Sequence, residues 1–291
     1  MLRRIAALAI SVLCIGVLVA PVWAASPVWQ VKKNGDVFYL AGTVHVLRAA
    51  DYPLPDAFGQ TFAKADQLIL ETDLAALQQP ELIKLQQQLL FYPAGQQLSN
   101  YLKPATQQAL ASQLGQQGLP AAALLQLKPG ALAAQLTMQI LQKAGFSAEG
   151  VDQHFLNLAK QQGKTLAFLE TPEFQLQLLG SLGQGREDEF VRMMLAEAKQ
   201  TESQLAALIA AWRRGDVAAL KQLALDELAQ QDADSYQRLF VQRNAAWLPQ
   251  LTALSENQQT ELVLVGAGHL VGPAGLLAQL EQAGYLVEQL P

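Results

Sequence analysis

Two segments of the chain, Phe38-Tyr-Leu-Ala-Gly-Thr-Val-His45 and Val263-Leu-Val-Gly-Ala-Gly-His269, decide how the sequence is interpreted. Each is an apolar run that leads into a glycine, with a histidine three residues after that glycine. Apolar runs of this kind are typical of strands in a sheet that is covered on both faces. We expect the glycines to let the backbone turn sharply. Because ligand sites of open α/β sheets lie beyond the carboxyl ends of strands, both imidazoles are predicted to lie at such a site.

Further strands are predicted on both sides of these segments. The clearest is a hairpin of residues 28–33 and 36–41, joined by Asn34-Gly35, which supplies the positive φ angles of a type I′ turn. Other strands are predicted over 67–71, 165–170, 261–265 and 285–290. Glu71 and Glu170 end two of these strands, so two histidines and two glutamates are expected at four strand ends.

The remaining sequence is rich in Leu, Ala and Gln, which favour helices, and most Gln residues are expected on solvated helix faces. Prolines at helix starts and glycines at helix ends mark most of the limits. Helices are predicted from Pro104 onward and over 129–145, 151–163, 187–213, 216–230, 234–256 and 273–284. The predicted fold class is a helix-rich α/β fold with a central mixed sheet, flanking helices and a long helical insertion over about 74–145. With no linker or repeat, residues 25–291 are expected to form a single domain.

The amino terminus is predicted to carry a targeting signal. Arg3 and Arg4 precede an apolar stretch over residues 5–20, and Val22 and Ala24 fit the −3 and −1 positions of a signal-peptidase site. We therefore predict a cleavable signal peptide over 1–24 and a periplasmic or secreted mature protein. The alternative is a membrane anchor, but this stretch is shorter than the roughly 20 apolar residues that a span needs. No stable membrane span is expected after cleavage.

The composition excludes several classes of protein. The 291 residues are 51% hydrophobic and 15% charged, which argues against a disordered chain. The single cysteine excludes a disulfide scaffold and lies within the predicted signal peptide. The net charge is −5 and no basic tract is present, so nucleic acid is not expected as a partner.

Each strand-end residue also has a structural explanation when it is considered alone. A histidine after a strand can cap a helix or bond a carbonyl, and Glu170 can be a first-turn acid of the helix after Pro172. The repeated Gly-x-x-His pattern favours a functional site. His154 lacks the strand-end setting, so a surface or packing role is expected for it.

Several segments resemble the TraB/PrgY/GumN family. Residues 37–45, Leu54-Pro55 and 65–72 resemble the family's opening segment, and Arg243-Asn244 with 265–275 resembles its second signature. Gly150-Val-Asp152 and Leu169-Glu-Thr171 match weaker motifs between them. Animal Tiki proteins, membrane-linked metalloproteases that trim Wnt signals, resemble the same family, and the wider group includes erythromycin-esterase-like and haem-binding ChaN-like folds. The resemblance implies an α/β core and a divalent-metal peptidase.

A ligand set follows from this reading. Neutral imidazoles of His45 and His269 and the carboxylate of Glu71 would hold one divalent ion such as Mn, Co, Zn or Fe. Glu170, or Glu71 if it is not a ligand, would move the proton. Asp152 and Arg243 are expected to orient a histidine or hold a carboxylate. The other residues expected to support the site are Gly42, Thr43, Gly266, Gly268 and Asn244.

Three functions of different classes stay open at this point. The first is a metal-dependent hydrolase of the cell envelope that acts on a peptide or another small envelope substrate. The second is a metal-free His/Glu hydrolase of the esterase type. The third is a non-catalytic protein that binds haem, a metal or a peptide signal. In each case the helical part over 74–145 is expected to form a wall or lid that sets specificity.

Overall fold

The computed structural model describes residues 25–257 and 259–291, so the predicted signal peptide lies outside the described residues. In this part of the chain six strands form one mixed sheet in the order β4-β3-β5-β2-β1-β6. The strands are β1 (Val28–Lys33), β2 (Asp36–Thr43), β3 (Gln67–Leu70), β4 (Thr165–Phe168), β5 (Glu261–Gly266) and β6 (Leu286–Gln289). The neighbours β4, β3, β5 and β2 are parallel, whereas β1 runs antiparallel to β2 and β6. The predicted helix-rich α/β class with a central mixed sheet is confirmed.

The hairpin at the start of the chain forms as predicted, with Asn34 and Gly35 at φ angles of 54° and 102°. The expectation of a sharp backbone turn at Gly42 and Gly266, the glycines of the two Gly-x-x-His segments, is wrong. Gly42 lies inside β2, paired with Val265, and Gly266 ends β5 with a φ of −51°. A Cβ on Gly42 would lie 3.1 Å from the Cα of Ala267, so this glycine allows two backbone segments to approach each other.

The helices follow the predicted order, although several of their limits differ and α1 was not predicted. The helices are α1 (Asp56–Lys64), α2 (Pro80–Leu90), α3 (Pro104–Gln116), α4 (Ala121–Leu124), α5 (Pro129–Lys143), α6 (Val151–Gln162), α7 (Pro172–Ser181), α8 (Glu187–Glu197), α9 (Thr201–Arg213), α10 (Val217–Lys221), α11 (Glu227–Gln231), α12 (Ala233–Tyr236), α13 (Gln242–Ala253) and α14 (Leu276–Gln282). The single helix predicted over 187–213 is two helices, because Gln200 N bonds to Glu197 O and closes a turn between them. The last helix begins at Leu276 rather than at Pro273, since Gly275 N bonds to Gly272 O in a preceding turn.

Shorter turns complete the described helical structure. Its 3₁₀ turns are η1 (Ala49–Asp51), η2 (Leu74–Gln78), η3 (Leu98–Tyr101), η6 (Leu254–Glu256) and η7 (Ala267–His269). Two π-helical turns, η4 (Gln222–Asp226) and η5 (Gln237–Val241), interrupt the carboxyl-terminal helices. Such turns are frequent near functional sites, and η5 leads directly into the start of α13.

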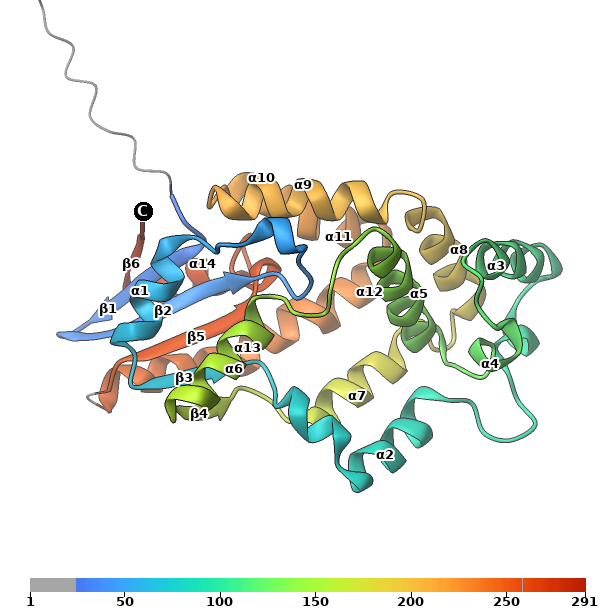
Figure 1. The fold of residues 1–291 in the computed structure, drawn as a ribbon, viewed down its shortest axis with the longest axis horizontal. Helices are drawn as coiled ribbons and strands as arrows, with labels where there is room; N and C mark the ends of the chain where they lie inside the picture. Colours follow the sequence, from blue (N-terminus) through green and yellow to red (C-terminus); the bar gives the residue numbers. More distant parts are fainter. Residues whose placement is uncertain (1–24, 258) are drawn as a thin grey trace, which may run out of the picture.

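The sheet and the helical insertion occupy different parts of the molecule. Figure 1 shows α1 and α6 on one face of the sheet and α13 and α14 behind it, while α2 to α5 and α8 lie at the other end. The central strands are buried because helices cover both faces, as their apolar runs predict. A second cluster of buried side chains, which includes Leu110, Leu132 and Val191, stabilises the helical end.

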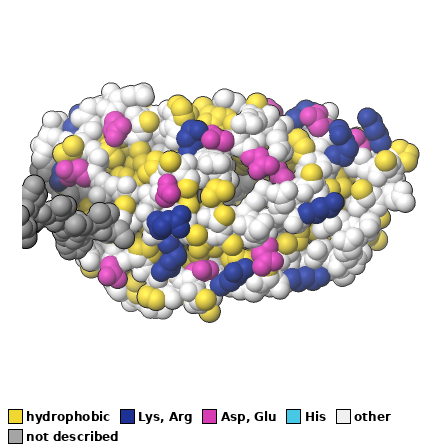
Figure 2. Space-filling view, turned by 90° about the horizontal axis from the view of Figure 1, so that it is seen from above, with side chains coloured by type: hydrophobic (Ala, Val, Ile, Leu, Met, Phe, Trp, Pro, Cys, Tyr) yellow, Lys and Arg dark blue, Asp and Glu magenta, His cyan; other side chains and the backbone are white. Residues whose placement is uncertain are grey.

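The surface carries charges of both signs. On the face in Figure 2, Lys and Arg side chains lie interspersed with Asp and Glu side chains. Within residues 25–257 and 259–291, none of the helices combines the length and the apolar character that a membrane crossing requires.

Candidate functional site

The four strand-end residues predicted from the sequence lie at the carboxyl ends of the four parallel strands. His45 follows β2, Glu71 follows β3, Glu170 follows β4 and His269 follows β5. A carbon in the Cβ position of Gly266 would lie 3.3 Å from Glu71 Oε1, 3.4 Å from His45 Nε2 and 3.7 Å from His269 Cδ2. Three side chains from distant parts of the sequence therefore surround one point above Gly266.

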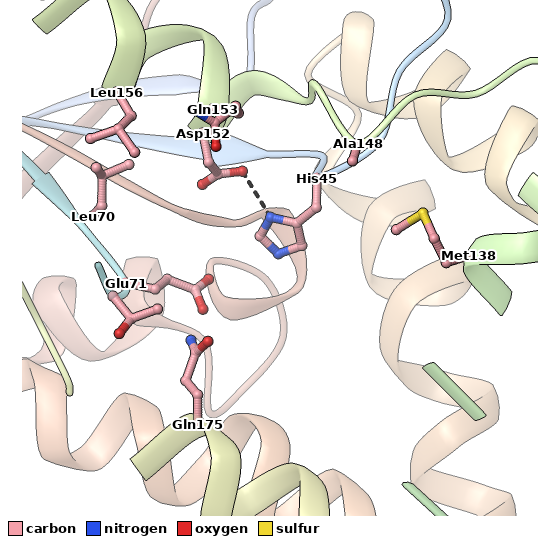
Figure 3. A pocket seen from close by; sticks show the side chains of 10 residues that line it. His45, Leu70, Glu71, Met138, Ala148, Asp152, Gln153, Leu156 and Gln175 are labelled. Atoms are coloured by element: carbon pink, nitrogen blue, oxygen red, sulfur yellow. Dashed lines mark hydrogen bonds and ion pairs between the residues drawn. The ribbon is translucent and has the colours of Figure 1, made fainter. Parts of the chain in front are cut away.

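His45 is held by a carboxylate on one side of its ring. Its Nδ1 lies 2.8 Å from Asp152 Oδ2, and the Thr43 hydroxyl donates to Asp152 Oδ1 at 3.0 Å. The His45 side chain is 62% exposed, and Figure 3 shows its other ring nitrogen turned toward Glu71. The negative charge of Asp152 raises the pKa of His45 to about 9.

The amino terminus of α6 places Asp152 against this histidine. Val151 N donates to Val44 O at 3.0 Å, which joins the start of α6 to the loop after β2. Gly150 lies so close to this loop that a Cβ would collide with backbone atoms of Val44 and His45. The Gly150-Val-Asp152 segment therefore needs both its glycine and its acid, since the glycine permits the approach that the carboxylate uses.

Glu71 is buried, and each of its carboxylate oxygens accepts a hydrogen bond. Its Oε1 accepts from Gly266 N at 2.7 Å, and its Oε2 accepts from Arg243 Nη2. Burial alone would raise the pKa of Glu71, but His269, Arg243 and His45 and the bond from Gly266 together lower it to about 2. The residue is therefore a carboxylate at neutral pH.

Arg243 lies at the centre of the buried side of the site. Its guanidinium binds both Glu71 and Glu170, and its Nη1 contacts Leu239 O at 3.2 Å and His269 Nε2 at 2.9 Å. Trp247, one helical turn later on α13, lies 4.6 Å from the guanidinium and donates to Glu170 Oε2 at 3.2 Å. Every nitrogen of Arg243 thus has a partner in the protein.

His269 is a buried, neutral acceptor. Arg243 can only donate, so His269 Nε2 accepts a hydrogen bond from Arg243 Nη1 and His269 Nδ1 donates to Asn244 Oδ1 at 2.7 Å. The rings of Trp247 and Phe240 lie 4.4 and 4.9 Å from the imidazole. Burial lowers the pKa of His269 to about 3.

The supporting residues Asn244 on α13 and Gly268 on the loop after β5 have specific packing roles. Asn244 Nδ2 donates to the backbone oxygens of His269 and Ala274, which ties α13 to the loop after β5. A Cβ on Gly268 would lie 2.7 Å from the ring of Phe240 in η5. The small residue at 268 therefore allows the π-helical turn to pack against the loop that carries His269.

The predicted metal ligands do not fit a divalent ion in this arrangement. His269 presents its acceptor nitrogen to Arg243, and the same guanidinium neutralises Glu71, so an ion would have to displace Arg243 from both. Among the described residues, no group of three His, Cys, Asp or Glu side chains is placed to hold a metal ion. The divalent metal stays a prediction from the sequence, and its test is given below.

A cavity of about 300 Å³ opens beside His45 and Glu71 (Figure 3). It is lined by His45, Leu70, Glu71, Thr72, Met138, Ala148, Asp152, Gln153, Leu156 and Gln175. Glu170 is not among the lining residues, so its carboxylate supports Arg243 and Trp247 from behind the site. His154 lies outside the site, where its exposed ring is 5.6 Å from that of Tyr52.

Gln175 and Trp247 bind the charged residues of the site, although neither is among the candidates predicted from the sequence. Gln175 lines the cavity and donates to Glu170 Oε1 at 3.0 Å, although Gln was expected mainly on solvated faces. Its position in the first turns of the helix after Glu170 was the available signal. Trp247 was detectable as an aromatic residue four positions after Arg243, on the same face of a predicted helix.

Comparisons with known proteins agree with the resemblance seen in the sequence. The model of the TraB/PrgY/gumN family matches residues 27–289. The chain is 27% identical over 243 residues to the uncharacterized protein YbaP of Escherichia coli strain K12. The matched region covers 82% of this chain and 86% of YbaP. No solved structure matches the chain.

Proposed function

The chain belongs to the TraB/PrgY/gumN family, and from that premise we propose that it is a metal-independent hydrolase of the cell envelope that cleaves an ester or amide bond. The observation that carries the proposal is the His45–Asp152 pair, whose second ring nitrogen and Glu71 Oε1 lie 3.4 and 3.3 Å from one point, the Cβ position of Gly266. An imidazole oriented by a carboxylate is the arrangement that general bases use in hydrolysis. The envelope location rests on the predicted signal peptide.

The proposed reaction uses water as the nucleophile. A water above Gly266 would donate one hydrogen bond to His45 Nε2 and the other to Glu71 Oε1. His45 takes the proton as the water oxygen attacks the carbonyl carbon, and Asp152 stabilises the imidazolium that forms. The imidazolium then gives this proton to the leaving oxygen or nitrogen as its bond to the carbonyl carbon breaks. The products are a carboxylic acid and an alcohol or amine.

The Gly266→Ala substitution is expected to remove activity without unfolding the protein. The new methyl group would occupy the space between His45 Nε2 and Glu71 Oε1, 3.4 and 3.3 Å away, where the proposal places the water. The backbone φ of −51° at this position suits alanine. Gly115→Ala in α3 is the matched control, because nothing lies within 4 Å of its Cβ position. Hydrolysis of 4-nitrophenyl esters, with thermal unfolding beside it, measures both effects, and full activity in Gly266→Ala contradicts the water position.

The pH dependence of kcat/KM is expected to follow His45. Because Asp152 raises the pKa of His45 to about 9, the imidazole is mostly protonated at neutral pH and gains its base form as pH rises. We therefore expect kcat/KM to increase with pH and to level off near pH 9. Asp152→Asn removes the largest cause of the raised pKa, so the inflection should move to lower pH. A profile that falls with rising pH would instead make His45 an acid in the reaction.

Elemental analysis separates this proposal from the metal-dependent hydrolase. The protein purified without chelator, together with its His45→Ala and His269→Ala variants, is assayed for bound metal and for activity after dialysis against EDTA. We expect activity that survives dialysis and no stoichiometric metal in any of the three. Stoichiometric metal in the parent protein that both variants lose, with activity that EDTA removes, would favour the metal-dependent hydrolase.

A further inference from the structure

We propose that the cavity beside His45 takes one uncharged apolar group of the substrate, so that the substrate is an ester or amide with an aliphatic or aromatic group next to the scissile carbonyl. This inference rests on the proposed hydrolase function and adds a substrate class to it. It is carried by the residues that line the cavity but take no part in the proposed chemistry.

Four of these residues form an apolar lining that is contributed by four separate elements. Leu70 ends β3, Met138 lies on α5, Ala148 lies in the loop before α6, and Leu156 lies on α6. Figure 3 shows Leu70 and Leu156 on one side of His45 and Met138 and Ala148 on the other. A group bound between them would lie next to the imidazole and the Glu71 carboxylate.

The size of the cavity limits the group that it can hold. Its volume is about 300 Å³. At roughly 30 Å³ for each water-sized atom, this volume holds about ten non-hydrogen atoms. A branched aliphatic or aromatic side chain fits together with the carbonyl that it carries. The volume lies at the lower end of the range typical of small-molecule pockets, so a single side chain suits it better than a large ligand.

The charges around the cavity disfavour an anionic group. Glu71 and Asp152 both line it, whereas none of its described lining residues is Lys or Arg. His45 is already paired with Asp152, and the donors of Arg243 are all bound within the protein. The positive charge of His45 is thus balanced by Asp152, and Glu71 adds a further negative charge, so a carboxylate on the substrate would lose its hydration against a net negative lining.

The test compares two ligands whose amino and carboxyl ends are both blocked as uncharged amides and which differ only in the side chain. N-acetyl-leucinamide and the α-amide of N-acetyl-glutamate are titrated against the purified protein, with Kd measured by ligand-detected NMR. We expect the leucine compound to bind at least about tenfold more tightly, in line with hydrophobic pockets of this kind. Met138→Lys places a cation in the apolar lining and should reduce this ratio about tenfold. Met193→Lys on α8 is the control, because Met193 is also half-buried but does not line this cavity.

Each outcome bears on one proposal. Equal affinities in the parent protein, or an unchanged ratio in a folded Met138→Lys variant, would overturn the substrate class. If Met138→Lys does not fold, Ala148→Lys in an exposed loop replaces it with the same expectation. Cleavage of esters or amides is measured in parallel. Tighter binding of the leucine compound without any cleavage would contradict only the hydrolase proposal. Cleavage without tighter binding of the leucine compound would contradict only the proposed apolar substrate group.

Discussion

The His45→Ala variant is expected to hydrolyse 4-nitrophenyl esters with a kcat/KM about 10²–10⁴-fold below that of the parent protein, which is the usual contribution of a general base. The substitution removes the ring nitrogen that faces Glu71 and one of the two hydrogen-bond partners of Asp152, the other being Thr43. Because the His45 side chain is 62% exposed, little packing is lost and the unfolding temperature should change by only a few degrees.

His154→Ala provides the control within the same chain. His154 lies on α6, two residues after Asp152, but its exposed ring packs beside Tyr52 and Phe155 rather than in the cavity. Its removal should leave kcat/KM within about twofold of the parent value, since surface changes away from such features have small effects. Equal losses in the two variants, or full activity in His45→Ala, would contradict the assignment of His45 as the base.

The Arg243→Leu variant is expected to lower the free energy of unfolding by about 3–5 kcal/mol, the cost of breaking a buried ion pair by removing one partner. Arg243 is only 7% exposed, and it is the cationic partner of both Glu71 and Glu170. Leucine would leave two carboxylates unpaired beside the buried Trp247 and His269. Urea denaturation followed by circular dichroism measures the difference.

Two further variants identify the source of this loss. Arg238, five residues before Arg243, forms an exposed pair with Asp234, so Arg238→Leu should cost no more than about 1 kcal/mol. Adding Glu170→Gln to Arg243→Leu removes one of the unpaired charges and should recover part of the lost stability. If Arg243→Leu costs no more than Arg238→Leu, the guanidinium does not hold the carboxylates as described.

The sequence was informative wherever a local pattern controls local structure. The Asn34-Gly35 turn, the apolar runs of the central strands and the prolines that begin α3 and α5 each formed the predicted elements. The prediction of one helix over 187–213 was wrong. The chain leaves the helix at a hydrogen-bonded turn that ends at Gln200, and no glycine or proline marks this turn in the sequence.

The strand-end residues could be located from the sequence, but their ionisation states could not. Parallel strands bring their carboxyl ends to one edge of a sheet, so residues about two hundred positions apart, such as His45 and His269, could be placed near one another from the sequence. The pKa values of the two histidines could not be predicted in this way. The pKa of His45 is raised to about 9 and that of His269 is lowered to about 3, although both follow the same Gly-x-x-His pattern.

The sequence by itself determined the family, the α/β class and the set of polar residues gathered at the end of the sheet. Only the tertiary structure decided which of them reaches the cavity and which is enclosed behind it. The physical reason is that burial and charge partners act through space: Asp152 from α6 holds the exposed imidazole of His45, while Arg243 and Trp247 from α13 enclose His269. A side chain's ionisation depends on these neighbours, and they come from helices that are remote in the sequence.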